Sequence, residues 1–292
     1  MTAAPDRPDL YRRNLLRALS LAPAGVALSA PAWAQDRAAA VGLISANVCL
    51  LQPEVTEGPY YIDPDLVRSD VTEGRPGVPL ELKMQVVDAD CTPVEGASVD
   101  IWHCDAQGNY SGFSGQGSDT VADTDGQTFL RGTQPTGADG VCAFRTIWPG
   151  WYRGRTPHVH YKVFLGERTV LTGQVFFPDA LSQYIYDTAP DYAREGGRDT
   201  WNRTDTIAEQ AGDGAQAAVR EQPDRYVAAL VVGIDRSATS SQGGTGDRPA
   251  GPPPGGPGQG APGEGAPGES GPGGPRPRSG GDAPSLLPGD DA

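Results

Sequence analysis

Short stretches in which apolar and polar residues alternate, separated by turns rich in glycine and proline, most constrain how this chain can fold. Residues 80–88 and 97–103 show the period of two that is typical of half-buried β-strands. Further strands are predicted at 128–132, 141–144, 158–164, 169–177 and 225–234. Asp139-Gly140 predicts a hairpin turn between the strands at 128–132 and 141–144. This pattern predicts an all-β fold, with a β-sandwich core, short helices and long loops.

The remaining segments of the core domain are predicted from composition. Residues 178–189 have the spacing of a short helix, and the alanine-rich run 204–220 is compatible with a second one. Residues 111–126 are rich in Gly, Asp and Ser, which predicts a long loop.

The two ends differ from the core in composition. Arg12-Arg13 precede an apolar run, and Ala32-Trp33-Ala34 form a small-x-small cleavage signal. We therefore expect a twin-arginine-type signal peptide at 1–34 and an exported protein, either periplasmic or extracellular. A flexible arm at 35–47 and the core domain at 48–236 follow. Residues 237–292 hold mainly Gly, Pro, Ser and acidic residues, which predicts a disordered tail.

The charge balance excludes some partners. The 292 residues carry a formal net charge of -14, so the chain has no electrostatic footprint for nucleic acid. After the signal no stretch is long and apolar enough for a stable membrane anchor. The four cysteines, Cys49, Cys91, Cys104 and Cys142, allow up to two disulfides with three connectivities, and their spacing does not choose among them.

Residues 148–161, WPGWYRGRTPHVHY, carry the strongest chemical signal. His158 and His160 lie one residue apart in a predicted strand, so their side chains share a face and form half of a metal site. Tyr152 in this motif and Tyr110 in a second motif, at 102–110, lie near turn glycines. Two phenolate oxygens and two imidazole nitrogens suit Fe(III) better than Zn(II) or Ca(II).

Several separate motifs resemble the intradiol ring-cleavage dioxygenases. They are TEGPYYI at 56–62, VDIWHCDAQGNYSGF at 99–113, TFLRG at 128–132, PGWYRGRTPHVH at 149–160 and TGQVFF at 172–177. The resemblance keeps motif order over about 48–190 and implies a β-sandwich that binds non-haem Fe(III). It does not extend to the long helical N-terminal segment of the catechol 1,2-dioxygenase branch. Substrate choice and oligomeric state therefore stay open.

The resemblance also implies roles for individual residues. Tyr110, Tyr152, His158 and His160 would bind the iron, and Tyr152 would act as a base when a catechol-type substrate displaces it. The ring would then be cleaved by O2 between its two hydroxyl-bearing carbons, which gives a cis,cis-muconate-type diacid. The other implied roles are stabilisation of substrate charge by Arg155, support of the oxygen pocket by Gln174, and contact with the substrate by Gly58, Pro59 and Tyr60.

Two alternatives belong to other classes of function. His103, His158 and His160 could form a three-histidine zinc site for hydrolysis. The chain could instead be an exported β-sandwich binding module without catalysis. Because His103 follows a tryptophan at a strand end, we interpret it as structural.

Overall fold

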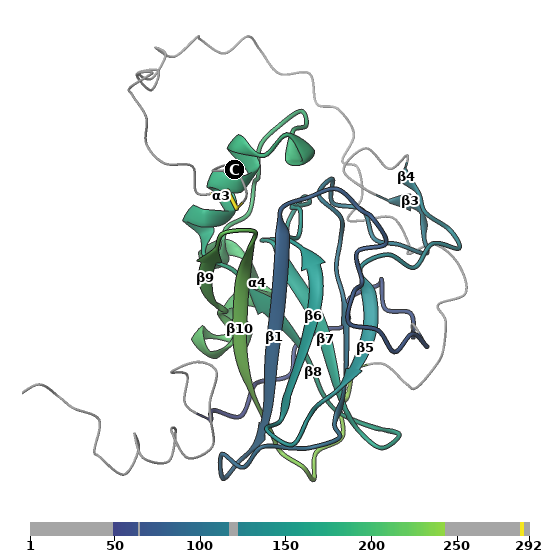
Figure 1. Cartoon of the computed structure of the whole chain (residues 1–292), viewed down its shortest axis with the longest axis vertical. Coiled ribbons are helices and arrows are strands. Elements are labelled where there is room, and N and C mark those ends of the chain that lie inside the picture. The colour runs from purple at the N-terminus through teal and green to yellow at the C-terminus, as the bar shows by residue number, and fades with distance from the viewer. Residues whose placement is uncertain (1–48, 64, 117–121, 243–286, 289–292) are drawn as a thin grey trace, which may run out of the picture. The chain divides into compact units, whose positions relative to one another are not determined.

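The computed structural model describes residues 49–63, 65–116, 122–242 and 287–288 (Figure 1). The predicted signal at 1–34, the arm at 35–47 and most of the predicted tail lie outside these residues. Among the described residues, no helix is long and apolar enough to cross a bilayer.

Within the described residues, the longer strands form two four-stranded sheets. The first sheet is ordered β6 (Val141–Ile147), β1 (Pro79–Asp88), β10 (Arg225–Ile234) and β9 (Ala218–Gln222). The second is ordered β5 (Arg131–Pro135), β2 (Ser98–Trp102), β7 (His158–Leu165) and β8 (Arg168–Phe176). β3 (Ser114–Gln116) and β4 (Ala122–Asp123) pair separately, inside the segment predicted to be a long loop. The predicted all-β fold is confirmed.

The core lies between the two sheets, and period-two alternation selects its residues. Leu82 and Met84 of β1 and Val159, Tyr161 and Val163 of β7 belong to one buried cluster. The intervening residues of β7 must therefore point to the outer face of the second sheet. Successive residues of β7 thus alternate between the core and the outer face of the second sheet, as the alternation in the sequence indicates.

The outer face of the second sheet is covered by protein. His160 lies opposite Trp102 of β2 and opposite Gln174 of β8, and cross-strand partners share a face. Residues 54–62, here called the strap, cross this face, since Val55 N donates to Thr172 O at 3.1 Å. His160 and Gln174 are consequently buried, at 2% and 1% exposure.

The helices lie outside the sheets, at α3 (Asp179–Thr188), α4 (Thr206–Ala211), and the 3₁₀ turns η1 (Pro190–Tyr192), η2 (Asn202–Thr204) and η3 (Asp213–Ala215). The helix predicted at 178–189 is confirmed by α3. A helix through 204–220 is wrong beyond Ala211. Gly212 ends α4 with φ of +70°, and residues 218–222 pair with β10 across a tight turn as β9.

The predictions for 128–144 need correction. Leu130 takes a left-handed φ of +57°, so the strand predicted at 128–132 begins only at Arg131. The turn at Asp139-Gly140 exists, but β5 pairs with β2 whereas β6 pairs with β1. The predicted hairpin is therefore wrong, and the turn carries the chain from one sheet to the other.

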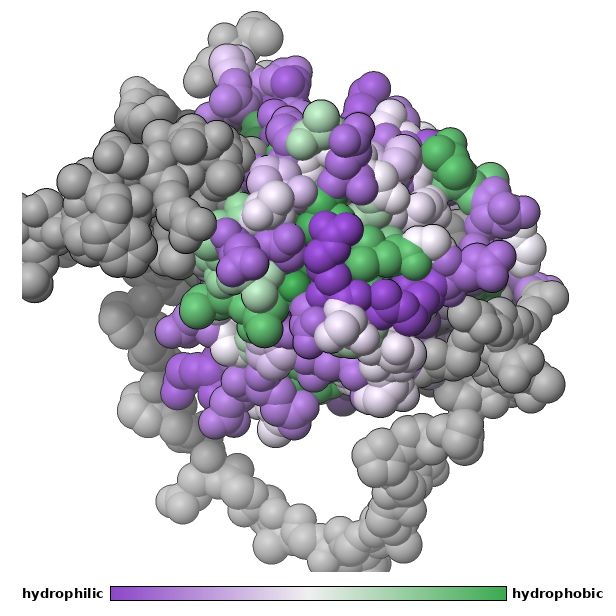
Figure 2. All heavy atoms as spheres, turned by 90° about the horizontal axis from the view of Figure 1, so that it is seen from below, coloured by the Kyte–Doolittle hydropathy of each residue, from purple (hydrophilic) through white to green (hydrophobic). Residues whose placement is uncertain are grey.

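The described chain continues past the predicted domain boundary at 236. Ser240 N donates to Thr169 O at 2.9 Å, and Ser241 N donates to Glu54 Oε2 at 3.0 Å. The surface seen from below Figure 1 is mostly hydrophilic, with separate hydrophobic patches (Figure 2). Among the described residues, the large hydrophobic side chains that are exposed are Leu50, Leu51 and Val67.

All four cysteines lie in the described residues, and they divide into one disulfide and two thiols. Cys49 and Cys91 are bonded across a sequence separation of 42, while Cys104 and Cys142 are free and buried. The disulfide ties the chain just before the strap to the turn that follows β1.

We expect the double substitution Cys49→Ser and Cys91→Ser to lower the free energy of unfolding by about 2–4 kcal/mol, because the crosslink restricts the unfolded chain. Urea unfolding followed by tryptophan fluorescence measures this. Wild-type protein under a reductant is the control and should match the variant. Equal midpoints for oxidised wild type and variant would contradict the expectation.

Candidate active site

Four polar side chains from two loops and one strand meet at the outer face of the second sheet. Tyr110 Oη lies 3.3 Å from Tyr152 Oη and 3.4 Å from His158 Nε2. Tyr152 Oη lies 3.0 Å from His158 Nε2, which is itself 3.0 Å from His160 Nε2. The structure thus brings together all four residues that the sequence singled out as metal ligands.

Close backbone contact between two loops brings the tyrosines together. Gly150 N donates to Asp105 O at 3.1 Å, and a Cβ at Gly150 would lie 2.4 Å from that oxygen. A Cβ at Gly108 would lie 2.6 Å from Trp151 O, and Gly108 also has a left-handed φ of +86°. Only glycine allows this approach without displacement of the backbone.

Both histidines point Nε2 at the centre, where these two atoms lie 3.0 Å apart. His158 Nδ1 lies 2.6 Å from Thr156 O, which accepts its proton and leaves the lone pair of Nε2 free. The ring of His160 is stacked on Trp102 at 4.9 Å. Burial, followed by the charge of Arg155, lowers the pKa of both histidines well below the ordinary value. Both imidazoles are therefore neutral, which is the form that binds metals.

The pKa values of the two phenols are shifted upward, opposite to those of the histidines. Burial raises the pKa of Tyr110 and of Tyr152 above the ordinary value and outweighs the opposing charge of Arg155, so both hydroxyls keep their protons when no metal ion is bound. A strong Lewis acid would be needed to hold the two as phenolates.

The donor set fits a small cation. Ligands about 2 Å from a metal lie about 3 Å from one another, and the four distances given above between these oxygen and nitrogen atoms are 3.0–3.4 Å. Four side chains, Tyr110, Tyr152, His160 and Arg155, also lie within 3.4 Å of His158 Nε2, more than its single lone pair can satisfy. A single metal ion bound between the two phenol oxygens and the two imidazole nitrogens would be a partner for all four atoms.

His103 does not belong to this centre. Its Nδ1 lies 2.8 Å from Cys104 O and its Nε2 lies 2.7 Å from Thr146 Oγ1, so both nitrogens are occupied. Across the described parts of the chain, no three His, Cys, Asp or Glu side chains are grouped to hold a metal ion. The three-histidine zinc alternative is therefore wrong, and the structural interpretation of His103 is confirmed.

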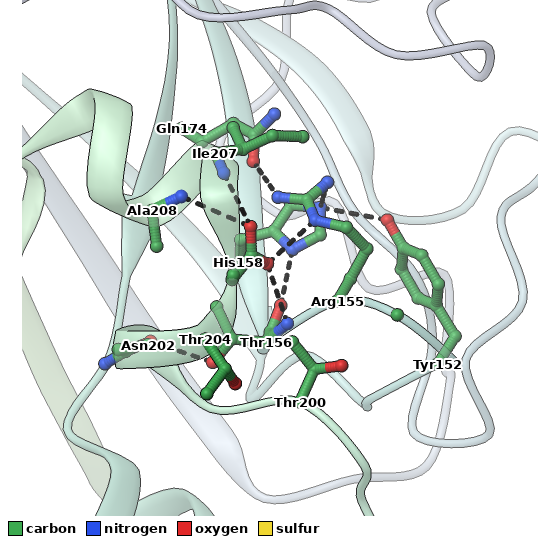
Figure 3. A network of polar contacts seen from close by, with 12 residues as sticks. Tyr152, Arg155, Thr156, His158, Gln174, Thr200, Asn202, Thr204, Ile207 and Ala208 are labelled. Carbon is green, nitrogen blue, oxygen red and sulfur yellow. Dashed lines mark hydrogen bonds and ion pairs between the residues drawn. The ribbon is translucent and has the colours of Figure 1, made fainter.

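Arg155 lies between His158 and Gln174, with Tyr152 nearby (Figure 3). Arg155 Nη1 is 3.3 Å from His158 Nε2, and Arg155 Nη2 donates to Gln174 Oε1. Gln174 Nε2 in turn donates to Thr56 O of the strap at 2.9 Å. Both predicted residues thus reach the centre, and Gln174 links Arg155 to the strap.

The strap carries the predicted substrate-binding residues, and two of them lie against the four central side chains. A Cβ at Gly58 would lie 3.3 Å from His160 Cε1, and Gly58 has a left-handed φ of +70°. The ring of Tyr60 is stacked on that of Tyr110 at 4.5 Å. Pro59 between them is exposed.

Asp205 is a site residue that the sequence did not reveal. Its Oδ2 accepts from Arg155 Nε at 2.8 Å and from Thr156 N at 2.9 Å. Its Oδ1 accepts from Ile207 N and Ala208 N and caps α4. An aspartate before an alanine-rich run indicates a helix cap, but no sequence signal connects it to Arg155.

The comparisons with known proteins agree with this site. A dioxygenase family model matches residues 53–196. Catechol 1,2-dioxygenase of Acinetobacter baylyi is 30% identical over 215 residues, which are 68% of this chain and 67% of that protein. A solved intradiol ring-cleavage dioxygenase from Tetranychus urticae is 35% identical, with a TM-score of 0.60 over 66% of this chain and 98% of that one. The chain belongs to the intradiol ring-cleavage dioxygenase family.

Coverage of other members of this dioxygenase family is partial. Catechol 1,2-dioxygenase 1 of Acinetobacter lwoffii is 30% identical over 145 residues, which are 42% of this chain and 45% of that protein. The chain spans about half the length of the first curated relatives it matches, at 45% and 54%.

We expect Asp205→Asn to lower dioxygenase turnover by up to about a hundred-fold, because a small misplacement of Arg155 is costly. Asparagine keeps an oxygen that can cap α4, so the melting temperature should change little. Steady-state kinetics and thermal unfolding measure the two effects. Asp224→Asn, in the exposed pair with Arg225, is the matched control. Full turnover in the Asp205 variant would contradict the positioning of Arg155 by this carboxylate.

Proposed function

We propose that this protein is an exported non-haem Fe(III) dioxygenase that cleaves a catechol-type ring between its two hydroxyl-bearing carbons. O2 is the second substrate, and a cis,cis-muconate-type diacid is the product. The convergence of two phenols and two imidazoles within 3.0–3.4 Å carries this proposal. The family match supports the same reaction class.

Tyr110, Tyr152, His158 and His160 would hold the iron. Hard phenolate oxygen favours a trivalent ion, and neutral imidazole nitrogen completes a set that suits iron. A bound ferric ion would supply the Lewis acidity that draws electron density from the substrate and prepares its ring for O2.

Tyr152 is the better placed phenol for proton transfer. Its side chain is part-buried, whereas Tyr110 is 1% exposed and stacked under Tyr60. Tyr152 Oη also lies at the centre of the site, 3.0 Å from His158 Nε2. In the iron-loaded site Tyr152 would be a phenolate, and its Oη would be placed to take a proton from an incoming diol.

Arg155 stabilises negative charge on the bound diol. Its guanidinium is fixed on one side by Asp205 and on another by Gln174, so the cation is oriented before substrate arrives. The side chain is mostly excluded from water, which strengthens its electrostatic effect on a substrate anion.

The surroundings of the four groups favour a flat, aromatic substrate. Tyr60 is stacked on Tyr110, and Phe113 meets Tyr60 edge-on at 5.1 Å. Aromatic rings prefer such stacked and edge-on neighbours. A bound diol ring would make the same kind of stacked or edge-on contact with these side chains, next to the iron.

Export through the twin-arginine route is part of the proposal. Arg12 and Arg13 in the N-terminal motif support it. The disulfide between Cys49 and Cys91 fits an oxidising compartment. That route transports folded proteins, which suits a metal site loaded before export.

The purified protein is expected to be red-brown, with about one ferric ion per chain, and to convert a diol into its diacid. Iron analysis, a visible spectrum and ultraviolet detection of muconates test this. The diols are catechol, protocatechuate and hydroxyquinol. Tyr110→Phe and His160→Ala should each lose most of the iron and the colour. Full iron occupancy in either variant, or a colourless and inactive wild type, would overturn the proposal, and the second result would favour a non-catalytic binding module.

Arg155→Ala should retain the iron but turn over diol about 10²–10³-fold more slowly, because a preorganised cation is lost. Steady-state kinetics and iron analysis on the same samples separate the two effects. The exposed neighbour Arg153→Ala is the matched control and should keep wild-type turnover. Equal rates for the two variants would remove Arg155 from the mechanism.

A further inference from the structure

A charged side chain lies buried on the same face of β7 as the two histidines. Lys162 follows His160 by two residues, so period-two alternation directs it to the outer face of the sheet. Its side chain is only 2% exposed. A buried ammonium is costly unless it is paired, and an apolar residue would fill this position at lower cost.

The partners of Lys162 come from the strap. Its Nζ lies 2.6 Å from Glu57 Oε2, as an ion pair without the alignment of a hydrogen bond. The same Nζ lies 3.8 Å from the centre of the Tyr61 ring, within the range of a cation–π contact. Lys162 therefore contacts the strap at two residues.

A second carboxylate completes the network from the sheet side. Asp100 of β2 lies directly opposite Lys162 in the strand register. Asp100 Oδ2 accepts from Tyr61 Oη at 2.9 Å, and Asp100 Oδ1 accepts from Thr133 Oγ1 at 2.6 Å. Tyr61 is thus held by its ring over Lys162 and by its hydroxyl on Asp100.

The two attachment points flank the residues that face the metal centre. Glu57 lies immediately before Gly58, and Tyr61 lies immediately after Tyr60. Gly58 approaches the ring of His160, and Tyr60 is stacked on Tyr110. A segment fixed at both ends cannot pivot away from the site, whereas a segment fixed at one end could.

We propose that Lys162 is a positioning residue for substrate binding, which acts through Glu57 and Tyr61 to hold Gly58, Pro59 and Tyr60 over the metal centre. The proposal rests on the proposed function. Its chemical consequence is a fixed distance between the Tyr60 ring and the metal ligands. That distance sets the space in which a catechol ring can bind.

The decisive variant is Lys162→Met in the full-length, iron-loaded protein, since methionine keeps an unbranched side chain without the charge. Anaerobic titration with 4-nitrocatechol gives a Kd that does not depend on turnover. Steady-state kinetics on the preferred diol and hydrogen exchange across 54–62 complete the experiment. We expect Kd and KM to rise at least about ten-fold and exchange in the strap to accelerate, while iron content stays unchanged and kcat falls less than KM rises.

Matched variants separate positioning from general destabilisation. Lys83→Met removes a part-exposed lysine that pairs with Glu81 on the first sheet, and should change none of these values. The double variant Lys162→Met with Glu57→Gln should bind 4-nitrocatechol more tightly than Lys162→Met, because it removes the Glu57 carboxylate that the single variant leaves without its cation. Rescue of this kind is not expected from a residue that serves only the general stability of the fold.

Each result bears on the proposal. Unchanged Kd and unchanged exchange in Lys162→Met would overturn it. If that variant fails to fold, Tyr61→Phe decides, since it removes only the hydroxyl bond to Asp100 and should weaken 4-nitrocatechol binding about three-fold or more. A wild type that turns over no diol would overturn the proposed function, whereas strap exchange and 4-nitrocatechol binding would still decide the role of Lys162.

Discussion

The alternation of side chains along β7 is the constraint on which the rest of the structure depends. Val159 and Tyr161 enter the core between the sheets, so His158, His160 and Lys162 must lie on the opposite face. The outer face of a sandwich sheet ordinarily meets water and carries polar residues. Here it is covered by the strap and α4, and the polar residues it carries become a buried site. One strand therefore supplies both packing and chemistry, and a shift of one residue in register would lose both.

Burial determines the protonation states of the four central side chains. It makes the imidazoles of His158 and His160 neutral and keeps the phenols of Tyr110 and Tyr152 protonated. The four side chains therefore carry no charge of their own, and the phenolic hydroxyls are the proton donors among them. Asp205 and Gln174 hold the cationic side chain of Arg155 at the edge of this group. A multivalent cation would stabilise this arrangement by binding the lone pairs and releasing the phenolic protons.

The sequence predicted those features that depend on local periodicity. The shared face of His158 and His160 follows from their spacing, and β1, β2, β8 and β10 follow from their alternation or apolar runs. The hairpin at Asp139-Gly140 was wrong because a turn signal does not reveal which sheet each flanking strand joins. The convergence of Tyr110 with Tyr152 was inferred from their motifs near turn glycines and from the family resemblance. Local periodicity does not reveal it, since it depends on contact between the backbones of two loops. Asp205 and Lys162 were missed for the same reason, because their partners lie 50 and 105 positions away.

The position of the strap explains why a single sequence does not specify the substrate. Glu54 at its start is held by Ser240 and Ser241 near the end of the described chain, and Tyr61 near its end is held by Asp100 of β2. Each of these hydrogen bonds is partly exposed and contributes little alone. Together they fix the strap, in which no residue belongs to a β-strand. The space above the four central side chains therefore depends on segments more than a hundred residues apart. Changes at any attachment would alter that space without touching those four side chains, so the substrate could change while the proposed iron site stayed the same.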